Sequence, residues 1–292
     1  MGKFCFLQFG DQRLCREMVT MQITVAKRKT SELLRGSGLW QSSFLSDEER
    51  RALERAAALP RSVQSHVDLV REGDHPDNLF MMIEGWAARY TTTREGHRQF
   101  SALLVAGDIC NLDTLLFDQS GCSVRMLTPA KIVALPRKSI AALATQHPGI
   151  ARTFTWLALV ENAALGKLTL TLGCGSAKKR LAHLLCELSV RVSTEQDDES
   201  SFDFPLTQEQ IGDALGLTAV HVNRMMKLLR AEGLVEIANR TMTLRSIAGL
   251  RRIGGFDPRY LHVRRAEADN TTRMSHAGST TSHSASSSRI GV

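Results

Sequence analysis

Short apolar segments alternate with regularly spaced glycines in the first half of the chain. Four such segments cover residues 79–83, 86–90, 100–104 and 131–135. Short strands bounded by turn residues at regular spacing are typical of an antiparallel sandwich or barrel. The pattern therefore predicts a β-roll, although a loop-rich α+β domain would also fit it. The glycines that mark the turns are Gly73, Gly85, Gly96, Gly107 and Gly121.

A helix is predicted before the glycine-rich region. Ser46 and Glu49 have the spacing of a capping box, in which each residue's side chain binds the other's backbone N–H. The helix is expected to run to about Ala58, because Pro60 cannot continue it.

A long helix is predicted over residues 148–173. Pro148 suits its first turn, where the missing N–H costs nothing. A heptad-like seam can pair with its own copy in a dimer or pack on its own domain, and the pattern alone allows both. The seam residues follow each other at alternating intervals of four and three: Ile150, Phe154, Leu157, Glu161, Ala164, Leu168 and Thr171.

The C-terminal third has the pattern of a winged helix-turn-helix. A further helix over residues 177–192 and an acidic loop over 195–203 precede it. Thr207 is a good N-cap for a helix over 208–215, Gly216 suits a tight turn, and Thr218 caps a second helix over 219–231. Two alternating segments, 234–237 and 241–244, then predict a hairpin wing.

The second of these helices has the composition of a helix that reads DNA. In a helix-turn-helix, the N-terminal part of this helix meets base edges in the major groove. Arg224 can bind guanine and Asn223 can bind adenine through paired hydrogen bonds, while Lys227 and Arg230 suit phosphates. An ordinary helical hairpin with a charged, solvated face is the alternative. The predicted DNA contacts are Thr207, Gln208, Thr218, Val220, His221, Asn223, Arg224 and Lys227.

The distribution of charge supports DNA contacts on the helix predicted over residues 219–231. The 292-residue chain has a formal net charge of +7, which favours an anionic partner only weakly. Residues 218–255 alone hold seven basic and two acidic residues, a net charge of +5, so the basic character is concentrated near the predicted reading helix.

No membrane segment or secretory signal is predicted, because the apolar runs are far shorter than the ~20 residues that a bilayer requires. The six cysteines are scattered, which favours the reducing cytoplasm over a disulfide framework. Residues 1–30 are predicted to be a disordered arm, because their basic and apolar residues show no clear period. Residues 256–292 are predicted to be a disordered tail, because its Ser/Thr/His-rich part holds too few apolar residues to fold.

Particular residues resemble the Crp/Fnr family of transcription regulators. The runs 206–218, 222–224 and 228–235 resemble the family's helix-turn-helix, and Ala177-Lys178-Lys179-Arg180-Leu181-Ala182 resembles the start of the preceding helix. Gly73-Asp74, Leu79-Phe80, Glu84-Gly85 and Gly107-Asp108 resemble the cyclic-nucleotide-binding-type β-roll, in the family's order. The similarity covers about residues 40–255.

This resemblance implies an α+β fold with three working parts. A jelly-roll-like sensor β-roll would occupy residues 31–147, a dimerisation helix 148–173, and a winged helix-turn-helix 174–255. It also implies a dimeric DNA-binding regulator in the cytoplasm that binds a palindromic operator and contacts RNA polymerase. No catalytic residue, metal or cofactor is expected, and the effector is not identified. A sensor or scaffold that has lost DNA binding is the alternative.

The chain departs from the family at functional positions. Members that bind cyclic nucleotides carry a Glu for the ribose and an Arg for the phosphate, whereas here Asn111-Leu112 and Ser120-Gly121 stand in those places. Cyclic AMP is therefore not expected as the effector, because a buried phosphate needs a cationic partner. Cys5 and Cys15 lack the spacing of the family's iron–sulfur ligands, and Val220 replaces a Glu that commonly reads cytosine.

Overall fold

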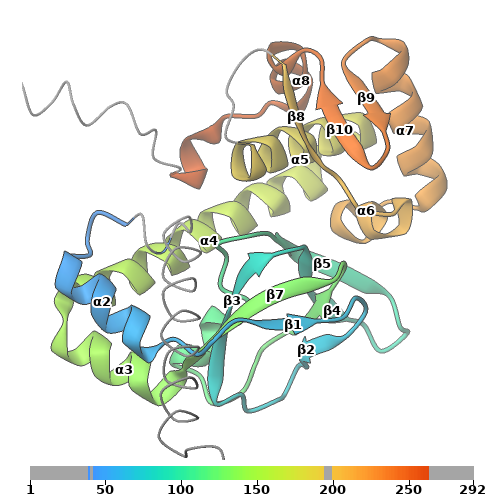
Figure 1. Ribbon diagram of the computed structural model, residues 1–292. Coiled ribbons are helices and arrows are strands. Elements are labelled where there is room, and N and C mark those ends of the chain that lie inside the picture. The colour runs from blue at the N-terminus through green and yellow to red at the C-terminus, as the bar shows by residue number, and fades with distance from the viewer. Residues whose placement is uncertain (1–38, 40–41, 194–198, 263–292) are drawn as a thin grey trace, which may run out of the picture.

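The computed structural model describes Leu39, residues 42–193 and residues 199–262. Two lobes are joined by the long helix α4 (Pro148–Cys174), with a β-roll at one end and a mostly helical C-terminal lobe at the other (Figure 1). The predicted α+β class and the order of its three parts are confirmed.

Two antiparallel sheets form the β-roll. One contains β1 (Arg61–Val63), β7 (Ala130–Pro136) and β3 (Asn78–Glu84) in that order. The other contains β2 (Asp68–Val70), β6 (Ser123–Met126), β4 (Ala87–Thr92) and β5 (Arg98–Leu104). The four apolar segments of the sequence correspond to β3, β4, β5 and β7, within a few residues at their ends.

Both faces of each sheet are covered by other parts of the molecule. This explains why the strands appear in the sequence as continuous apolar runs rather than alternating ones. Met82 and Ile132 point between the sheets, while their neighbours Met81 and Val133 point to the opposite face, toward the helices. In the second sheet, Ala88, Tyr90 and Phe100 belong to a cluster that continues into the C-terminal lobe. One hydrophobic cluster therefore extends across both lobes.

Two short helices flank the roll. The capping box at Ser46 and Glu49 is present, and it opens α2 (Asp47–Ala56) as predicted. Helix α3 (Arg137–Gln146) was not predicted from the sequence, because only Ile140 of its ten residues is buried and its pattern has weak helical periodicity. A one-turn 3-10 helix, η1 (Leu112–Leu115), lies between β5 and β6.

Glu49 links α2 to the first turn of α4. One of its carboxylate oxygens accepts from Ser46 N at 2.8 Å, and the other accepts from Gly149 N at 2.8 Å. The hydrogen bond from the Ser46 backbone is the main cause that lowers the pKa of Glu49 from its ordinary value of 4.5. A side chain at Gly149 would collide with the Phe44 carbonyl oxygen and with Glu49, so this joint requires glycine.

Replacing Glu49 with glutamine is expected to lower the free energy of unfolding by about 1–2 kcal/mol at pH 7. Glutamine has one acceptor oxygen for two N–H donors. Because the pKa of Glu49 is lowered on folding, its stabilisation is full above pH 4.5 and is lost as the pH falls through the folded value. Urea unfolding at several pH values measures the difference. Glu48→Gln, an exposed neighbour in the same turn, is the control, and an equal loss in both variants would contradict the role of Glu49.

The predicted seam of α4 faces its own domain. Ile150, Phe154 and Thr171 are buried, and Leu157 packs against the core of the roll. Glu161 forms an ion pair with Arg89 of β4, at 3.0 Å. Packing on its own domain is therefore confirmed for Ile150, Phe154 and Leu157, whereas pairing of this helix with a second copy stays a prediction.

The C-terminal lobe contains more regular structure than the sequence predicted. Helix α5 (Ala177–Val192) matches its prediction, and the wing strands are β9 (Val235–Ala238) and β10 (Thr241–Leu244). The prediction of a loop over 195–203 is wrong for its last residues, because β8 (Ser200–Asp203) pairs with β10 through the buried Phe202. Residues 194–198 lie outside the described residues.

The chain stays ordered past residue 255. Helix α8 (Ile247–Gly254) is followed by the 3-10 helix η2 (Pro258–Leu261), in which Tyr260 and Leu261 are buried. The predicted disordered tail is therefore wrong for residues 256–262, since three apolar side chains there find partners in the lobe's core. The predicted arm and the rest of the tail lie outside the described residues.

Candidate nucleic-acid interface

Helix α6 (Gln208–Leu215) begins at the predicted N-cap. The Thr207 hydroxyl accepts from Gln210 N at 3.2 Å, and the Gln210 side chain accepts from Thr207 N at 2.9 Å. The side chains of Thr207 and Gln208 are exposed at this end. The other end stops at Gly216, whose φ of +61° favours glycine.

The turn between the two helices needs a second glycine that the sequence analysis did not single out. A Cβ at Gly212 would lie 2.4 Å from the Leu217 carbonyl oxygen, and the Gly212 carbonyl itself accepts from Leu217 N at 3.1 Å. This close approach sets the angle at which the next helix leaves α6.

Helix α7 (Ala219–Ala231) has the bounds that the sequence predicted. The Thr218 hydroxyl accepts from His221 N at 3.3 Å and caps the helix. Val222, Met225, Met226 and Leu229 are buried on its inner side. These four residues recur at helical spacing, so they determine which side of α7 faces outward.

The outer side of α7 is open at its N-terminal end. Val220 is 80% exposed, an unusual value for a large apolar side chain. His221, Arg224 and Lys227 are exposed, and Asn223 is half-buried. Among the described residues, Arg224 and Lys227 form no ion pair, so both cations are available to an outside partner.

The first turn of α7 is electropositive. It contains no acidic residue, and a helix N-terminus carries unpaired N–H groups and a partial positive charge. The structure therefore places Val220, His221, Arg224 and Lys227 on the exposed side of α7. Thr207 and Gln208 lie at the end of α6 opposite the turn into α7.

The wing is a three-stranded sheet in the order β8-β10-β9. Asn239 and Arg240 form its two-residue tip with φ of +50° and +64°, as a type I′ turn requires. Arg240 is exposed there, and its carbonyl oxygen accepts from Phe204 N at 2.7 Å. The tip therefore presents a cation on a fixed backbone.

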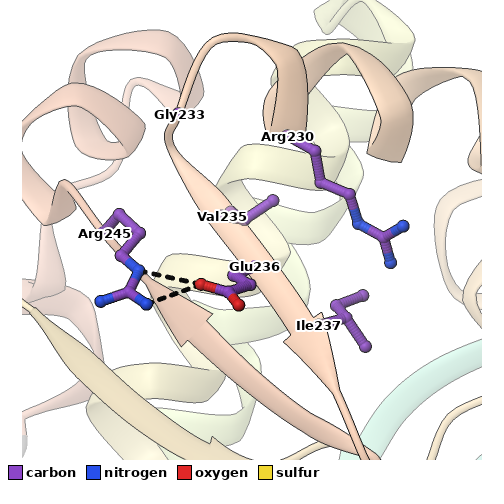
Figure 2. A pocket seen from close by; sticks show the side chains of 6 residues that line it. All are labelled: Arg230, Gly233, Val235, Glu236, Ile237 and Arg245. Atoms are coloured by element: carbon purple, nitrogen blue, oxygen red, sulfur yellow. Dashed lines mark hydrogen bonds and ion pairs between the residues drawn. The ribbon is translucent and has the colours of Figure 1, made fainter.

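A hollow of about 390 Å³ lies between the end of α7 and the wing. Figure 2 shows Arg245 paired with Glu236 on one side and Arg230 pointing away on the other. Arg245 also pairs with Glu199, so two carboxylates neutralise it. Within the described part of the chain, Arg230 has no ion pair and is the cation of this hollow that remains available.

The β-roll contacts α6 directly. Arg98 of β5 donates from Nε to Asp213 at 2.8 Å, and the Gln99 side chain donates to the Ala214 carbonyl at 3.3 Å. Sequence reasoning missed these residues, because the partners are 115 positions apart and nothing local marks them. The contact ties the β-roll to the helix that precedes α7.

The interior of the roll uses its own polar groups. The buried Asn111 accepts from Phe80 N at 2.9 Å and donates to the Asn78 carbonyl and the Thr114 hydroxyl. Arg89 donates to both oxygens of Glu161 and to the carbonyls of Ile109 and Cys110. Burial acts to lower the pKa of Arg89, but Glu161 outweighs it and the pKa is raised. No group of three or more His, Cys, Asp or Glu side chains in the described ranges is placed to hold a metal ion.

Comparison with known proteins matches both lobes. Residues 60–147 match the cyclic nucleotide-binding domain family, and residues 179–253 match the Crp-like helix-turn-helix domain family. The fumarate and nitrate reduction regulatory protein of Vibrio cholerae is 24% identical over 211 residues, which are 72% of this chain and 84% of that protein. A probable transcriptional activator of Rhizobium leguminosarum is 27% identical over 195 residues, 67% of this chain and 80% of that protein.

Solved structures show the same fold. FixK2 from Bradyrhizobium japonicum is 21% identical, with a TM-score of 0.63 over 69% of this chain and 98% of its own. A β-roll, a long helix and an exposed winged helix-turn-helix define a DNA-binding transcription regulator. The chain belongs to the Crp/Fnr family of these regulators. The relatives named here are regulators rather than enzymes.

Proposed function

We propose that the chain binds a palindromic operator as a homodimer and reads it with α7. Arg224 would donate to guanine, Asn223 would bind adenine, and Val220 would meet a thymine methyl group. Lys227 and the start of α6, with Thr207 and Gln208, would contact phosphates. The observation that carries the proposal is the open, cationic front of α7, where Val220 is 80% exposed.

His221 and Thr218 are proposed to act together at the start of α7. The Thr218 hydroxyl lies 3.5 Å from Nδ1 of His221, so the imidazole ring sits over the helix cap. From there the ring reaches either a base edge or a phosphate. The Thr218 hydroxyl and the His221 ring both lie at the N-terminal end of α7, where anions bind most favourably.

The outward face of α4 supports the homodimer. Leu159 and Leu170, which are eleven residues apart and so lie on one side of the helix, are 63% and 57% exposed, and Leu165 is 47% exposed. Contrary to the sequence prediction, α4 is long and apolar enough to cross a bilayer by length and composition, and only 6% of its most apolar window is buried. Its inner side is tied to Arg89, so α4 is part of a folded domain, and a second copy is the proposed cover.

Two reading helices related by a dimer axis would enter successive major grooves about 34 Å apart, which implies a palindromic site. The proposed setting is the cytoplasm, with RNA polymerase as a further partner. The proposed effector is not cyclic AMP, because Asn111 is fully used by the roll and Arg89 is paired with Glu161. A sensor or scaffold without DNA binding is the competing function.

A salt series on purified protein separates these functions. Affinity for double-stranded DNA, measured by fluorescence anisotropy, is expected to fall steeply between 50 and 200 mM salt. For 6–10 phosphate contacts the fall is about a thousandfold or more. Absence of binding at every salt concentration, with the protein folded, would favour the scaffold. In-vitro selection from random DNA then gives the operator sequence, with and without candidate effectors.

A further inference from the structure

The segment after α8 closes over the core of the C-terminal lobe. Phe256, Tyr260 and Leu261 are buried in the shared hydrophobic cluster. Helix η2, which holds the last two of these residues, packs against α4, and Lys167 of α4 lies 5.9 Å from the centre of the Tyr260 ring. We call residues 256–262 the closing segment. It holds α5, α8 and α4 together at the joint between the lobes.

A continuous chain of polar contacts connects the closing segment to the β-roll. The Tyr260 hydroxyl donates to Glu187 of α5 at 2.7 Å. Glu187 pairs with Arg191 at 3.4 Å, and Arg191 pairs with Asp108 at 2.5 Å. Asp108 lies in the turn after β5, where the same carboxylate oxygen also accepts from Val105 N at 2.8 Å.

The side chains in this series of polar contacts are largely buried, which strengthens the ion pairs between them. Arg191 and Glu187 each expose only 18% of their side chains. Burial acts to lower the pKa of Arg191, but Asp108 and Glu187 outweigh it and the pKa is raised. Burial is also the main cause that raises the pKa of Tyr260, which keeps the hydroxyl protonated as a donor. Removing one partner of such a network leaves a buried charge without compensation.

His183 anchors the other side of Tyr260. One ring nitrogen lies 3.3 Å from the Gly254 carbonyl oxygen, and the other lies 3.2 Å from the Tyr260 hydroxyl. The His183 ring also meets Phe256 edge-on, with centroids 5.1 Å apart. The closing segment is thus held at two points, by packing on His183 and by the hydrogen bond to Glu187.

We propose that Asp108, Arg191, Glu187 and Tyr260 form a coupling route from the sensor lobe to the closing segment. Asp108 positions Arg191, Arg191 holds the Glu187 carboxylate, and Glu187 holds Tyr260. A displacement of the turn at Gly107 and Asp108 therefore loosens the closing segment and with it the joint between α4 and the C-terminal lobe. The proposal does not depend on DNA binding.

Amide hydrogen exchange of the free, full-length protein tests the route. Asp108→Asn removes the charge that Arg191 needs, while the asparagine oxygen can still accept from Val105 N. Exchange in residues 256–262 is expected to rise by roughly two- to hundredfold, far from the substituted site. Glu84→Gln, which breaks the exposed pair with Lys131 in the same β-roll, is the control and should leave that exchange unchanged.

A double-mutant cycle with Tyr260→Phe makes the test specific. Tyr260→Phe alone should raise the same exchange, and adding Asp108→Asn should have little further effect, because both break one route. If the increases in exchange rate caused by the two substitutions multiply in the double variant, the proposal is overturned. It is also overturned if Asp108→Asn leaves the exchange of residues 256–262 unchanged. An equal rise across the whole C-terminal lobe would mean general destabilisation and would also overturn it. If Asp108→Asn does not fold, Asp108→Glu, which keeps the charge but displaces the carboxylate, takes its place with the same expected result.

Discussion

Replacing Leu159 with glutamate is expected to convert the proposed dimer into monomers and to weaken binding to the proposed operator by about 100- to 10,000-fold. Leu159 is 63% exposed in the single chain, so the substitution leaves the fold intact. In the proposed dimer, two carboxylates would be buried opposite each other without a partner, which is strongly unfavourable. A monomer also loses the gain in affinity that comes from binding two half-sites at once. Analytical ultracentrifugation measures the first effect and anisotropy the second.

The matched control for Leu159→Glu is Ala142→Glu on α3. It adds the same charge at an exposed helical position away from the outward face of α4. The control should stay dimeric and bind normally. If Leu159→Glu also remains a dimer, the outward face of α4 is not the contact and another surface must join the two copies.

Replacing Arg224 with alanine is expected to cost about 1–3 kcal/mol on the specific site, or roughly 5- to 150-fold in affinity. It should also relax the preference at one base pair of each half-site. The exposed guanidinium lies one turn into α7, where a bidentate contact with guanine is possible. Selection from random DNA with the variant measures the change in base preference directly.

Lys227→Ala is the informative comparison for Arg224→Ala. Lys227 is exposed one turn further along α7, where a phosphate is the expected partner. The loss of Lys227 should weaken binding to all sequences alike and reduce by about one the slope of log affinity against log salt concentration.

If the base preference of Arg224→Ala is unchanged, direct readout by Arg224 is contradicted.

Local features of the sequence were sufficient for α7 and its surroundings. Thr218 as N-cap, Gly216 as a left-handed turn and the spacing of Val222, Met225 and Leu229 each act within a few residues, so helix bounds and the outward face could both be predicted. The capping box of Ser46 and Glu49 is another local signal, and it was equally informative about α2. The roles of Val220 and Arg224 toward bases stay predictions.

Features that depend on distant partners could not be predicted. The apolar seam from Ile150 to Thr171 has the same spacing whether its partner is a second helix or the chain's own β-roll, and the structure packs its first apolar residues on the roll. The outward face of α4 was missed because its heptad positions include Asn162, Gly166 and Thr169 beside Leu159. Strand β8 and the pairing of Arg98 with Asp213 depend on residues far apart in sequence, where no periodicity is informative.

The hydrophobic cluster that runs from β4 and β5 into the C-terminal lobe has a consequence for how the gene can be divided. A fragment that starts near residue 174 would leave Leu181, Ile211 and their neighbours without Tyr90 and Phe100, and a fragment that ends there would expose the opposite surface. Each fragment would therefore expose apolar surface that the whole chain buries, although the two parts match separate domain families. A chimaera that moves the C-terminal lobe onto another protein would need the sheet of β4 and β5 to cover the same surface.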